Sequence, residues 1–576
     1  MGSRKNRGHL SLAAEWAVPL LLSLQSFLGA LQLLDALDVV YYAMIHKSTT
    51  SIQFDLGLSL VAPLILLLAL WLVWIMWNLR FEVLLLPAAA LFLYPLGLET
   101  CVSIASLMAA AGGLVYHRGL SKLLNIVFAL LGGIEGLALI HWLFFVPLGL
   151  ASPLKAVARL EMGLFYVTSH LAPFLVLLLM YTWMMTPFIP NRWKDTFGIR
   201  GSTSKERGEM PHRVKYLLIL CVSLSVVAAL YPYNSNVNPT RQLFGSDIQY
   251  YIETAEIAEN NLYQTLTQNA TTRPFIFIVI YGYRRLLGTN VTNAVKFLPV
   301  LLNPLLSTAM FFLALETFDD WWIASLASFF TACGIQVSVG MYAYFLTNML
   351  GLCLSFFSLG FLIRALRMGN WFSMTIAGLF GGLQVFTHPW TFDQYVIPTV
   401  MMGGVMWYHA KIKKYSYGRE KMVLYYLFLL GLAELFKSVF FGGYSGTQAT
   451  ETALKNLVNL SDFWFVNIYV FRILFGGLLS AVVLLSFTTL GFHLFGLTGI
   501  PNLYFFLFLM VTSLFFLVGN DIVKSRLLYN IPHGLFAAYG FSWFIKRRDL
   551  AFRNVFTTFC VLNVAAYLFR SLANLV

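Results

Sequence analysis

Apolar residues form long runs along almost the whole chain, and short polar segments separate them. The runs are about 20 residues long, which is the length that an α-helix needs to cross a bilayer. A backbone in lipid must satisfy its own hydrogen bonds, and runs this continuous are too long for the strands of a barrel. The pattern therefore predicts an all-α, polytopic helical membrane protein.

The first part of the chain, residues 1–188, is predicted to be a membrane domain of about six spans. The basic segment "GSRKNRGH" at its start places the N-terminus in the cytoplasm by the positive-inside rule. No cleavage site of a signal peptide is expected after the first apolar run. The expected spans are 14–35, 55–78, 82–98, 100–116, 122–150 and 158–188.

Residues 189–215 are the most polar stretch and are predicted to be a cytoplasmic linker between two domains. Residues 216–576 then form a second membrane domain, with polar loops 233–289 and 442–467 on the external or lumenal side. This orientation keeps three later basic clusters in the cytoplasm. The expected spans are 216–232, 290–316, 321–338, 342–366, 370–388, 393–412, 421–441, 468–497, 501–519, 527–545 and 552–575.

Composition agrees with this pattern, because 59% of the 576 residues are hydrophobic and only 11% are charged. The net charge of +13 fits basic cytoplasmic loops facing anionic lipid. The basic residues are scattered over short loops, so no nucleic-acid partner is expected. The cysteines all lie in apolar runs, as small core residues rather than disulfides or metal ligands: Cys101, Cys221, Cys333, Cys353 and Cys560.

The first external loop contains "FGSDIQYYIETAEIAENN", residues 244–261. Ser246 and Gln249 have the spacing of a capping box, which makes Asp247 the first helical residue. We therefore expect an amphipathic helix at the membrane surface with a carboxylate at its N-terminus. Its apolar stripe comprises Ile248, Tyr251, Ile252, Ala255, Ala258 and Leu262.

Asp247 has two interpretations. An acidic residue in the first turn complements the helix dipole, which is a purely structural reason for its presence. A carboxylate there also suits the orientation of a nucleophile or the binding of a divalent cation. Tyr250 and Tyr251 lie on the same side of the helix and would border such a site. The other acidic residues of the helix are expected on a solvated face: Glu253, Glu256 and Glu259.

Residues 274–288, "PFIFIVIYGYRRLLG", are apolar but short for a span. A crossing there would also conflict with the positive-inside rule, because Arg284 and Arg285 belong to an external loop. We therefore expect this segment to lie along the outer interface, where Arg and Tyr suit the headgroup level.

This arrangement resembles the GT-C superfamily of membrane glycosyltransferases over about residues 214–576. The likeness consists of a span, an external loop with an early Asp and "YY", "TRPFIFIVIYGYRRLLG", and another span. It implies transfer of a sugar from a polyprenyl-phosphate carrier to a lipid, glycan or protein acceptor. The transfer is expected to be inverting and to occur on the external or lumenal face of the plasma membrane or the endoplasmic reticulum.

The resemblance also implies roles for two residues. Asp247 matches the loop carboxylate of the family, which serves as a base or a metal ligand, and Arg273 at the Arg-Pro position lines the same cavity. Many members carry paired acids there, whereas this sequence has the single acid of "SD". A divalent cation, Mg²⁺ or Mn²⁺, is therefore left open as a cofactor, and no metal ligands are assigned.

His388 lies in "QVFTHPWTF", residues 384–392, at the external end of an expected span. Pro389 and Trp390 directly after it indicate a helix stop with an aromatic residue at the interface. The alternative is that His388 binds a phosphate or acts together with Asp247.

The segment "NDIVKSRLLYNIPHGLFAAYGF", residues 520–541, carries Lys524 and Arg526 on the external side, against the positive-inside rule. A lipid-linked phosphate would explain them, because the planar guanidinium of Arg suits phosphate. A surface ion pair with Asp521 is the structural alternative. GT-C proteins similarly carry an Arg before a late span with a Pro soon after, which Arg526 and Pro532 match. The next turns would add two residues to the cavity, Tyr529 and His533.

Two other functions compete with sugar transfer. A transporter or lipid flippase would explain many spans with charges near their ends, although the two halves of this chain do not resemble each other. An inactive GT-C-like scaffold is the third class, because the N-terminal spans could bind a membrane-protein partner. Three glycosylation sequons are allowed by the predicted topology: Asn269, Asn290 and Asn459.

Overall fold

The regular elements of this protein are helices throughout the part of the chain that the computed structural model describes, and none is a strand there. The described residues belong to two compact units, one with residues 121–130 and 554–556 and one with the rest. The predicted all-α fold is confirmed. The described ranges are 121–169, 208–412, 419–441, 482–494, 499–518 and 521–574.

Several of the helices are long and apolar enough to cross a membrane. Among the described residues there are seven such segments, which confirms the prediction of a multi-pass membrane protein. They are Val127–Leu148, His212–Tyr233, Val291–Phe318, Trp321–Ala343, Leu346–Met368, Glu420–Phe441 and Leu550–Ala573.

Within the described residues, most helix bounds lie close to those of the predicted spans. The earlier helices are α5 (Ser121–Ile140), η3 (His141–Phe145), α6 (Val146–Leu148), α7 (Lys155–Ser169), α10 (His212–Leu230) and η5 (Tyr231–Tyr233). The later long helices are α15 (Pro299–Phe318), α16 (Trp321–Ala332), α17 (Ile335–Ala343), α18 (Leu346–Met368), α19 (Trp371–Val385), α20 (Pro389–Ile412), α21 (Glu420–Phe441), α24 (Val482–Leu494), α25 (Ile500–Val518) and α28 (Leu550–Asn574).

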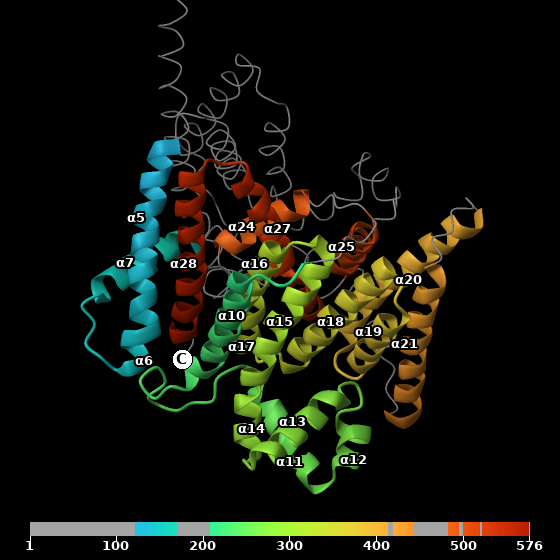
Figure 1. The fold of residues 1–576 in the computed structure, drawn as a ribbon. Helices are drawn as coiled ribbons and strands as arrows, with labels where there is room; N and C mark the ends of the chain where they lie inside the picture. The colour runs from blue at the N-terminus through green and yellow to red at the C-terminus, as the bar shows by residue number, and fades with distance from the viewer. Residues whose placement is uncertain are drawn as a thin grey trace, which may run out of the picture. The chain divides into compact units, whose positions relative to one another are not determined.

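The core of the larger unit is built around α15, α16 and α18. Helix α15 packs against α16, α18 and α10, and α16 also packs against α27 (His533–Lys546) (Figure 1). The span Trp321–Ala343 is buried apart from Trp321, Trp322 and Tyr342, whereas few residues of Glu420–Phe441 are buried. An apolar helix with so few of its residues buried suits contact with lipid.

The predicted spans 321–338 and 342–366 meet differently from what we expected. The first helix breaks at Cys333 and Gly334, and α17 then runs to Ala343. Tyr344 follows with a left-handed backbone (φ 56°), and α18 begins at Leu346. This turn matters for function, because the candidate site lies directly against it.

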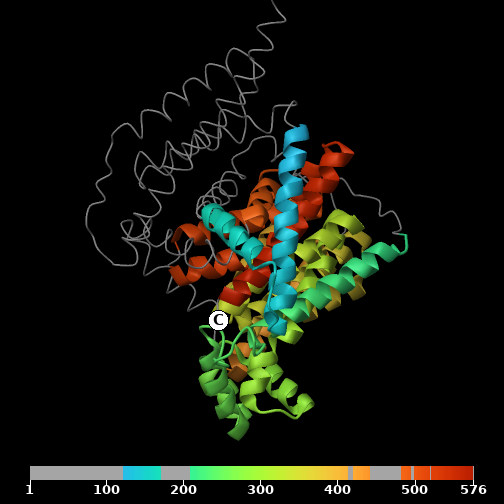
Figure 2. The same cartoon turned by 90° about the vertical axis from the view of Figure 1, so that its left-hand side faces the viewer.

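A group of shorter helices forms from the first external loop. It comprises α11 (Ile248–Asn260), α12 (Leu262–Gln264), η6 (Thr265–Asn269), α13 (Pro274–Leu287) and α14 (Val291–Phe297). Both views show the group together at one end of the longer helices (Figures 1 and 2). The predicted apolar stripe of α11 is confirmed, since all its members are buried except the half-buried Leu262.

Helix α13 has only 14 residues and ends at Gly288, which adopts the left-handed conformation. It is too short to cross a bilayer, as the sequence predicted. Its Arg284 is not a bare charge, because Nη1 lies 2.7 Å from Oε2 of Glu259. Glu259 is therefore paired and not simply part of a solvated face, which corrects that expectation.

Prolines mark two helix boundaries near the candidate site, and one of them divides a predicted span. The expected span 527–545 is divided into α26 (Asp521–Tyr529) and α27, because Pro532 has no N–H to continue a helix. Near His388, α19 already ends at Val385, and Pro389 opens α20. The predicted helix stop near His388 is therefore present, and Pro389 then opens the next helix, consistent with its fixed φ at a first helical position.

A buried ion pair joins α7 to α28. Glu161 of α7 pairs with Arg570 of α28, and both side chains are almost fully buried. Trp142 Nε1 donates to Glu161 at 3.4 Å, and Asn563 Nδ2 of α28 donates to Glu135 at 2.9 Å. Removing one partner of such a pair would leave an uncompensated charge in the interior.

Some predictions fall outside the described residues. They are the spans before residue 121, most of the linker 189–215 and the loop 442–467, and the domain boundary stays a prediction. Cys101 also lies there, whereas the other four cysteines are buried and free.

Candidate active site

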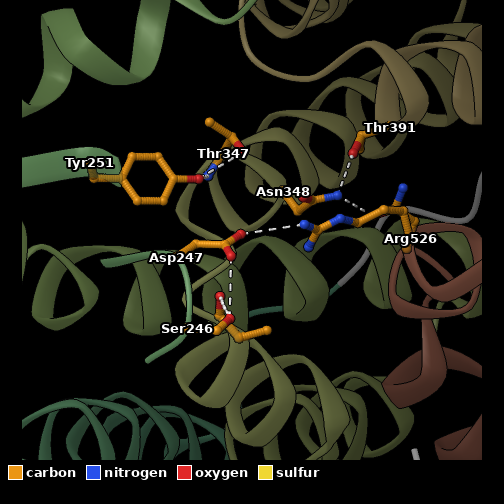
Figure 3. A network of polar contacts seen from close by, with 9 residues as sticks. Ser246, Asp247, Tyr251, Thr347, Asn348, Thr391 and Arg526 are labelled. Carbon is orange, nitrogen blue, oxygen red and sulfur yellow. Dashed lines mark hydrogen bonds and ion pairs between the residues drawn. The ribbon is translucent and has the colours of Figure 1, made fainter. Parts of the chain in front are cut away.

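The structure brings into direct contact two residues, Asp247 and Arg526, that the sequence analysis expected at one external cavity. Arg526 Nη2 of α26 lies 3.5 Å from Asp247 Oδ2 at the start of α11. Figure 3 shows the carboxylate facing the guanidinium beside a network of polar side chains. The side chain of Asp247 is 38% exposed and that of Arg526 is 13% exposed. The pair therefore lies at the boundary between solvent and a buried polar region.

Asp247 is held in a way that the sequence did not predict. It is the N-cap of α11 rather than its first helical residue, and its side chain makes no capping hydrogen bond. Ser246 Oγ does not cap the helix either, but donates to the carbonyl of Ala343 at 3.0 Å and to Asp247 Oδ1 at 3.3 Å. The predicted capping box is thus wrong, and the carboxylate is left available for Arg526.

Gly245 fixes the approach of the chain to Asp247. Its φ of +107° lies in a region that favours glycine, and an added Cβ would come within 2.5 Å of the Tyr344 ring. Ser246 N also donates to the carbonyl of Tyr342 at 3.1 Å. The turn between α17 and α18 therefore contacts the chain just before Asp247 and positions its carboxylate.

Arg526 is oriented by an aromatic ring. Its guanidinium carbon lies 3.2 Å from the centroid of the Phe345 ring, and the ring of Tyr529 packs edge-on against Phe345. Burial lowers the pKa of Arg526 to about 10, while Asp247 acts in the opposite direction, so the group is cationic at neutral pH. Nη1 is buried and has no hydrogen-bond partner in the described part of the chain.

Asn348 connects Arg526's helix to the turn around His388. Its Nδ2 donates to Asn530 Oδ1 at 3.3 Å and to Thr391 Oγ1 at 3.4 Å. Thr391 Oγ1 is in turn 3.4 Å from His388 Nδ1. Asn530 Nδ2 is a second buried donor that lacks a partner among the described residues. The region therefore offers free N–H groups next to a cation.

His388 is almost fully buried. Burial lowers its pKa well below the ordinary value, and the positive charges of Arg273 and Arg526 act in the same direction. The imidazole is therefore neutral at physiological pH. It suits hydrogen bonding better than a charged contact with phosphate.

Arg273 is the N-cap of α13 and is half-buried. It lies close enough to Arg526, Tyr251 and His388 for its charge to act on all three. The backbone bond from Phe275 N to the carbonyl of Phe386, 3.0 Å long, holds the start of α13 beside the His388 turn. No carboxylate of the described residues lies within ion-pair distance of Arg273.

The two tyrosines of α11 differ in exposure. Tyr251 is buried, and its hydroxyl lies 3.1 Å from Thr347 Oγ1 and accepts from Thr347 N at 3.3 Å (Figure 3). Burial raises its pKa, so it is a neutral hydroxyl near two arginines. Tyr250 is 43% exposed and packs edge-on against Tyr251 and Phe277.

The remaining predicted site residues are placed less directly. The hydroxyl of Tyr529 donates to the carbonyl of Gln336 at 2.8 Å, so Tyr529 supports Phe345 by packing. His533 is buried, and its Nε2 donates to the carbonyl of Leu528 at 2.9 Å. The side chain of Lys524 lies outside the described residues.

The described residues offer no preformed cluster of side chains for a divalent cation. Within them, no group of three or more His, Cys, Asp or Glu side chains is placed to hold a metal ion. Asp247 instead faces the guanidinium of Arg526. No step below is therefore assigned to a metal.

Sequence reasoning missed several polar members of the site. Thr347, Asn348 and Thr391 lie within or beside apolar runs, where a polar residue has many structural uses. Asn530 stands two residues before Pro532, and a helix break there would have drawn attention to it. Phe345 carried no signal among the many phenylalanines of this chain.

Comparison with solved structures found a similarity to an archaeal oligosaccharyltransferase, AglB from Archaeoglobus fulgidus, solved in complex with an inhibitory peptide and a dolichol-phosphate. The identity is 15% and the TM-score 0.44, over 62% of this chain and 55% of that chain. The match thus spans about half the length of that protein. No protein-family model and no curated protein matches. The function proposed below rests on the residues of this chain alone.

Proposed function

We propose that this chain is a membrane glycosyltransferase that moves a sugar from a polyprenyl-phosphate carrier to an acceptor on the external or lumenal face. One observation carries the proposal. Asp247 and Arg526 face each other at 3.5 Å, and the buried Nη1 of Arg526 has no hydrogen-bond partner among the described residues. A carboxylate beside a free guanidinium edge suits a reaction in which a hydroxyl attacks and a phosphate leaves.

Arg526 binds the phosphate of the donor through its free Nη1 edge. Charge-assisted hydrogen bonds from a guanidinium to phosphate are among the strongest in proteins. Stacking on Phe345 holds the guanidinium plane, so little reorganisation is needed when the phosphate leaves. Arg273 adds a second positive charge nearby, and Asn530 Nδ2 adds a neutral donor.

Asp247 orients the acceptor. Its Oδ1 accepts from Ser246 and its Oδ2 faces Arg526, and a carboxylate has further lone pairs for a hydroxyl hydrogen. The acceptor oxygen forms a bond to the anomeric carbon while the bond from that carbon to the phosphate oxygen breaks. The hydroxyl proton passes to Asp247, and the polyprenyl phosphate leaves with its charge facing Arg526. Such a direct displacement inverts the configuration at the anomeric carbon.

Tyr250 and His388 complete the substrate contacts. The exposed ring of Tyr250, one helical turn after Asp247, offers an apolar face next to the acceptor. The neutral His388 reaches the site through Thr391 and Asn348 and contributes hydrogen bonds rather than charge.

Reconstitution of the purified full chain into vesicles with radiolabelled polyprenyl-phosphate sugars tests this function. The expected result is label in a new product together with release of polyprenyl phosphate. Movement of intact donor between leaflets without a new product would instead identify a transporter or flippase. Binding of the donor without a new product and without movement between leaflets would identify a scaffold. Either the transporter result or the scaffold result would overturn the proposal.

A further inference from the structure

A second pair of positive charges lies near Tyr344, whose hydroxyl donates to the carbonyl of Lys296 at 3.1 Å. Arg241 belongs to the loop before α11, and Lys296 belongs to α14. Arg241 lies close enough to Lys296 for its charge to act on that ammonium group. No carboxylate of the described residues lies within ion-pair distance of either cation. Two like charges brought together in this way repel each other unless an anion joins them.

The loop holds Arg241 in an unusual backbone conformation. Its φ is +53°, which residues other than glycine rarely adopt. The buried Asn238 stabilises this turn, because its Oδ1 accepts from Gln242 N at 3.2 Å and its Nδ2 donates to Gln242 O at 2.8 Å. The backbone N–H of Arg241 donates to the carbonyl of Asn238 at 3.1 Å. The exposed arginine is thus presented by an ordered turn.

Lys296 is also fixed in place. Its ammonium lies 4.5 Å from the centroid of the Tyr233 ring and 5.3 Å from that of Phe297. The hydroxyl of Tyr233 donates to that of Tyr344 at 3.5 Å, and Tyr344 donates to the carbonyl of Val295 at 2.8 Å. Aromatic contacts and backbone bonds therefore position the ammonium before any ligand arrives.

The position of the pair along the helices indicates what kind of anion it meets. Tyr233 is the last residue of the candidate span His212–Tyr233, and Lys296 lies near the start of the span Val291–Phe318. The two residues touch, so they lie at the same end of neighbouring spans. Tyrosine and lysine at the end of a span are typical of the headgroup level of a bilayer.

We propose that Arg241 and Lys296 bind the phosphate of an anionic membrane lipid. The two cations supply the charge, the guanidinium supplies paired donors, and the ends of the spans place them at the depth of lipid phosphates. The exposed Leu243, two residues after Arg241, adds apolar contact next to the site. The bound lipid would hold the loop that leads to Asp247, independently of whether the chain transfers sugar.

Native mass spectrometry of the purified full chain, titrated in detergent with phosphatidylglycerol, tests this site. Arg241→Gln and Lys296→Gln are each expected to weaken lipid binding by about tenfold, the loss typical of one charge-assisted hydrogen bond. Lys296→Arg is expected to retain binding, because it keeps the charge. Thermal unfolding that matches the wild type identifies the glutamine variants as folded.

Arg285→Gln is the matched control. Arg285 is exposed on α13, and its guanidinium carbon lies 5.1 Å from the Tyr281 ring centroid, so it is a cation beside an aromatic ring as Lys296 is. Unchanged lipid binding in this variant supports the site. Equal losses of lipid binding in all three glutamine variants would mean that net charge alone explains the binding, and this would overturn the proposed site. Displacement of the lipid by millimolar inorganic phosphate would assign the site to free phosphate and overturn the lipid assignment.

Discussion

Asp247 Oδ2 and Arg526 Nη2 lie 3.5 Å apart, although 279 positions separate the two residues in the chain. The contact joins the start of a surface helix to a short helix before a late apolar one. Each residue is oriented by the same turn between α17 and α18, since Ser246 donates to Ala343 and Arg526 stacks on Phe345. Variants of these two residues therefore give the sharpest tests of the proposed chemistry.

Asp247→Asn keeps the size of the side chain but removes its charge and its capacity to take a proton. We expect sugar transfer to fall by about 100-fold or more while the protein still inserts into membranes. Glu253→Gln is the control, because Glu253 is exposed on the same helix and accepts a hydrogen bond from Gln249. Normal turnover by the Asp247 variant, measured with radiolabelled donor, would remove Asp247 from the mechanism.

Arg526→Lys keeps the positive charge but loses the planar donor set and the stacking on Phe345. We expect turnover to fall by about 100-fold, because the leaving phosphate loses its positioned donors. Arg284→Lys, at a residue paired with Glu259, is expected to retain transfer. Equal activity of the two lysine variants would mean that charge alone matters at Arg526.

Gly245→Ala combines a strained backbone with a clash against Tyr344. Gly288→Ala is matched to it, because Gly288 also has a positive φ (+61°) but meets nothing within 4 Å. Gly288→Ala is expected to lower stability by about 1 kcal/mol and to leave transfer intact. Gly245→Ala is expected to lose more stability and most of the transfer. Thermal unfolding and turnover are measured for both variants. Equal losses in the two would contradict the proposed role of Gly245.

His388 gives a pH dependence of stability with a definite sign. Burial lowers its pKa well below the ordinary value of 6.5 in the folded protein. The unfolded chain therefore takes up a proton that the folded chain does not, and stability falls as the pH drops below 6.5. The thermal unfolding temperature should decrease between about pH 7.5 and 5.5, and less so in His388→Gln. Identical decreases in both proteins would exclude His388 as the cause.

Variants of the Glu161–Arg570 pair test how strongly this contact between α7 and α28 stabilises the protein. Glu161→Gln and Arg570→Gln each leave one charge buried without its partner, so each should destabilise the protein by about 3 kcal/mol or more. Replacement of both residues by leucine should recover much of the loss. Thermal unfolding in detergent measures these effects, and a double variant less stable than either single variant would contradict this account.

The spans were predictable because runs of about 20 apolar residues have few other uses. Asp247 and Arg526 were identifiable one by one, since each is a charge that simple topology rules do not explain. We expected the two to share a cavity, but their direct contact was not derivable, because it depends on the turn at Tyr344 and on Gly245, and neither carries a pattern of its own. The break at Pro532 was missed because the surrounding residues are apolar enough to suggest one continuous span. Asn348 and Thr391 look like ordinary polar residues until the fold brings them to His388.

A cryo-electron microscopy structure of the full chain with bound polyprenyl phosphate tests the central claim most directly. The lipid phosphate is predicted to lie within hydrogen-bond distance of the Nη1 atom of Arg526, with Asp247 open to solvent on its other side. A phosphate bound away from Arg526, with the pair unchanged and closed, would contradict the proposed site.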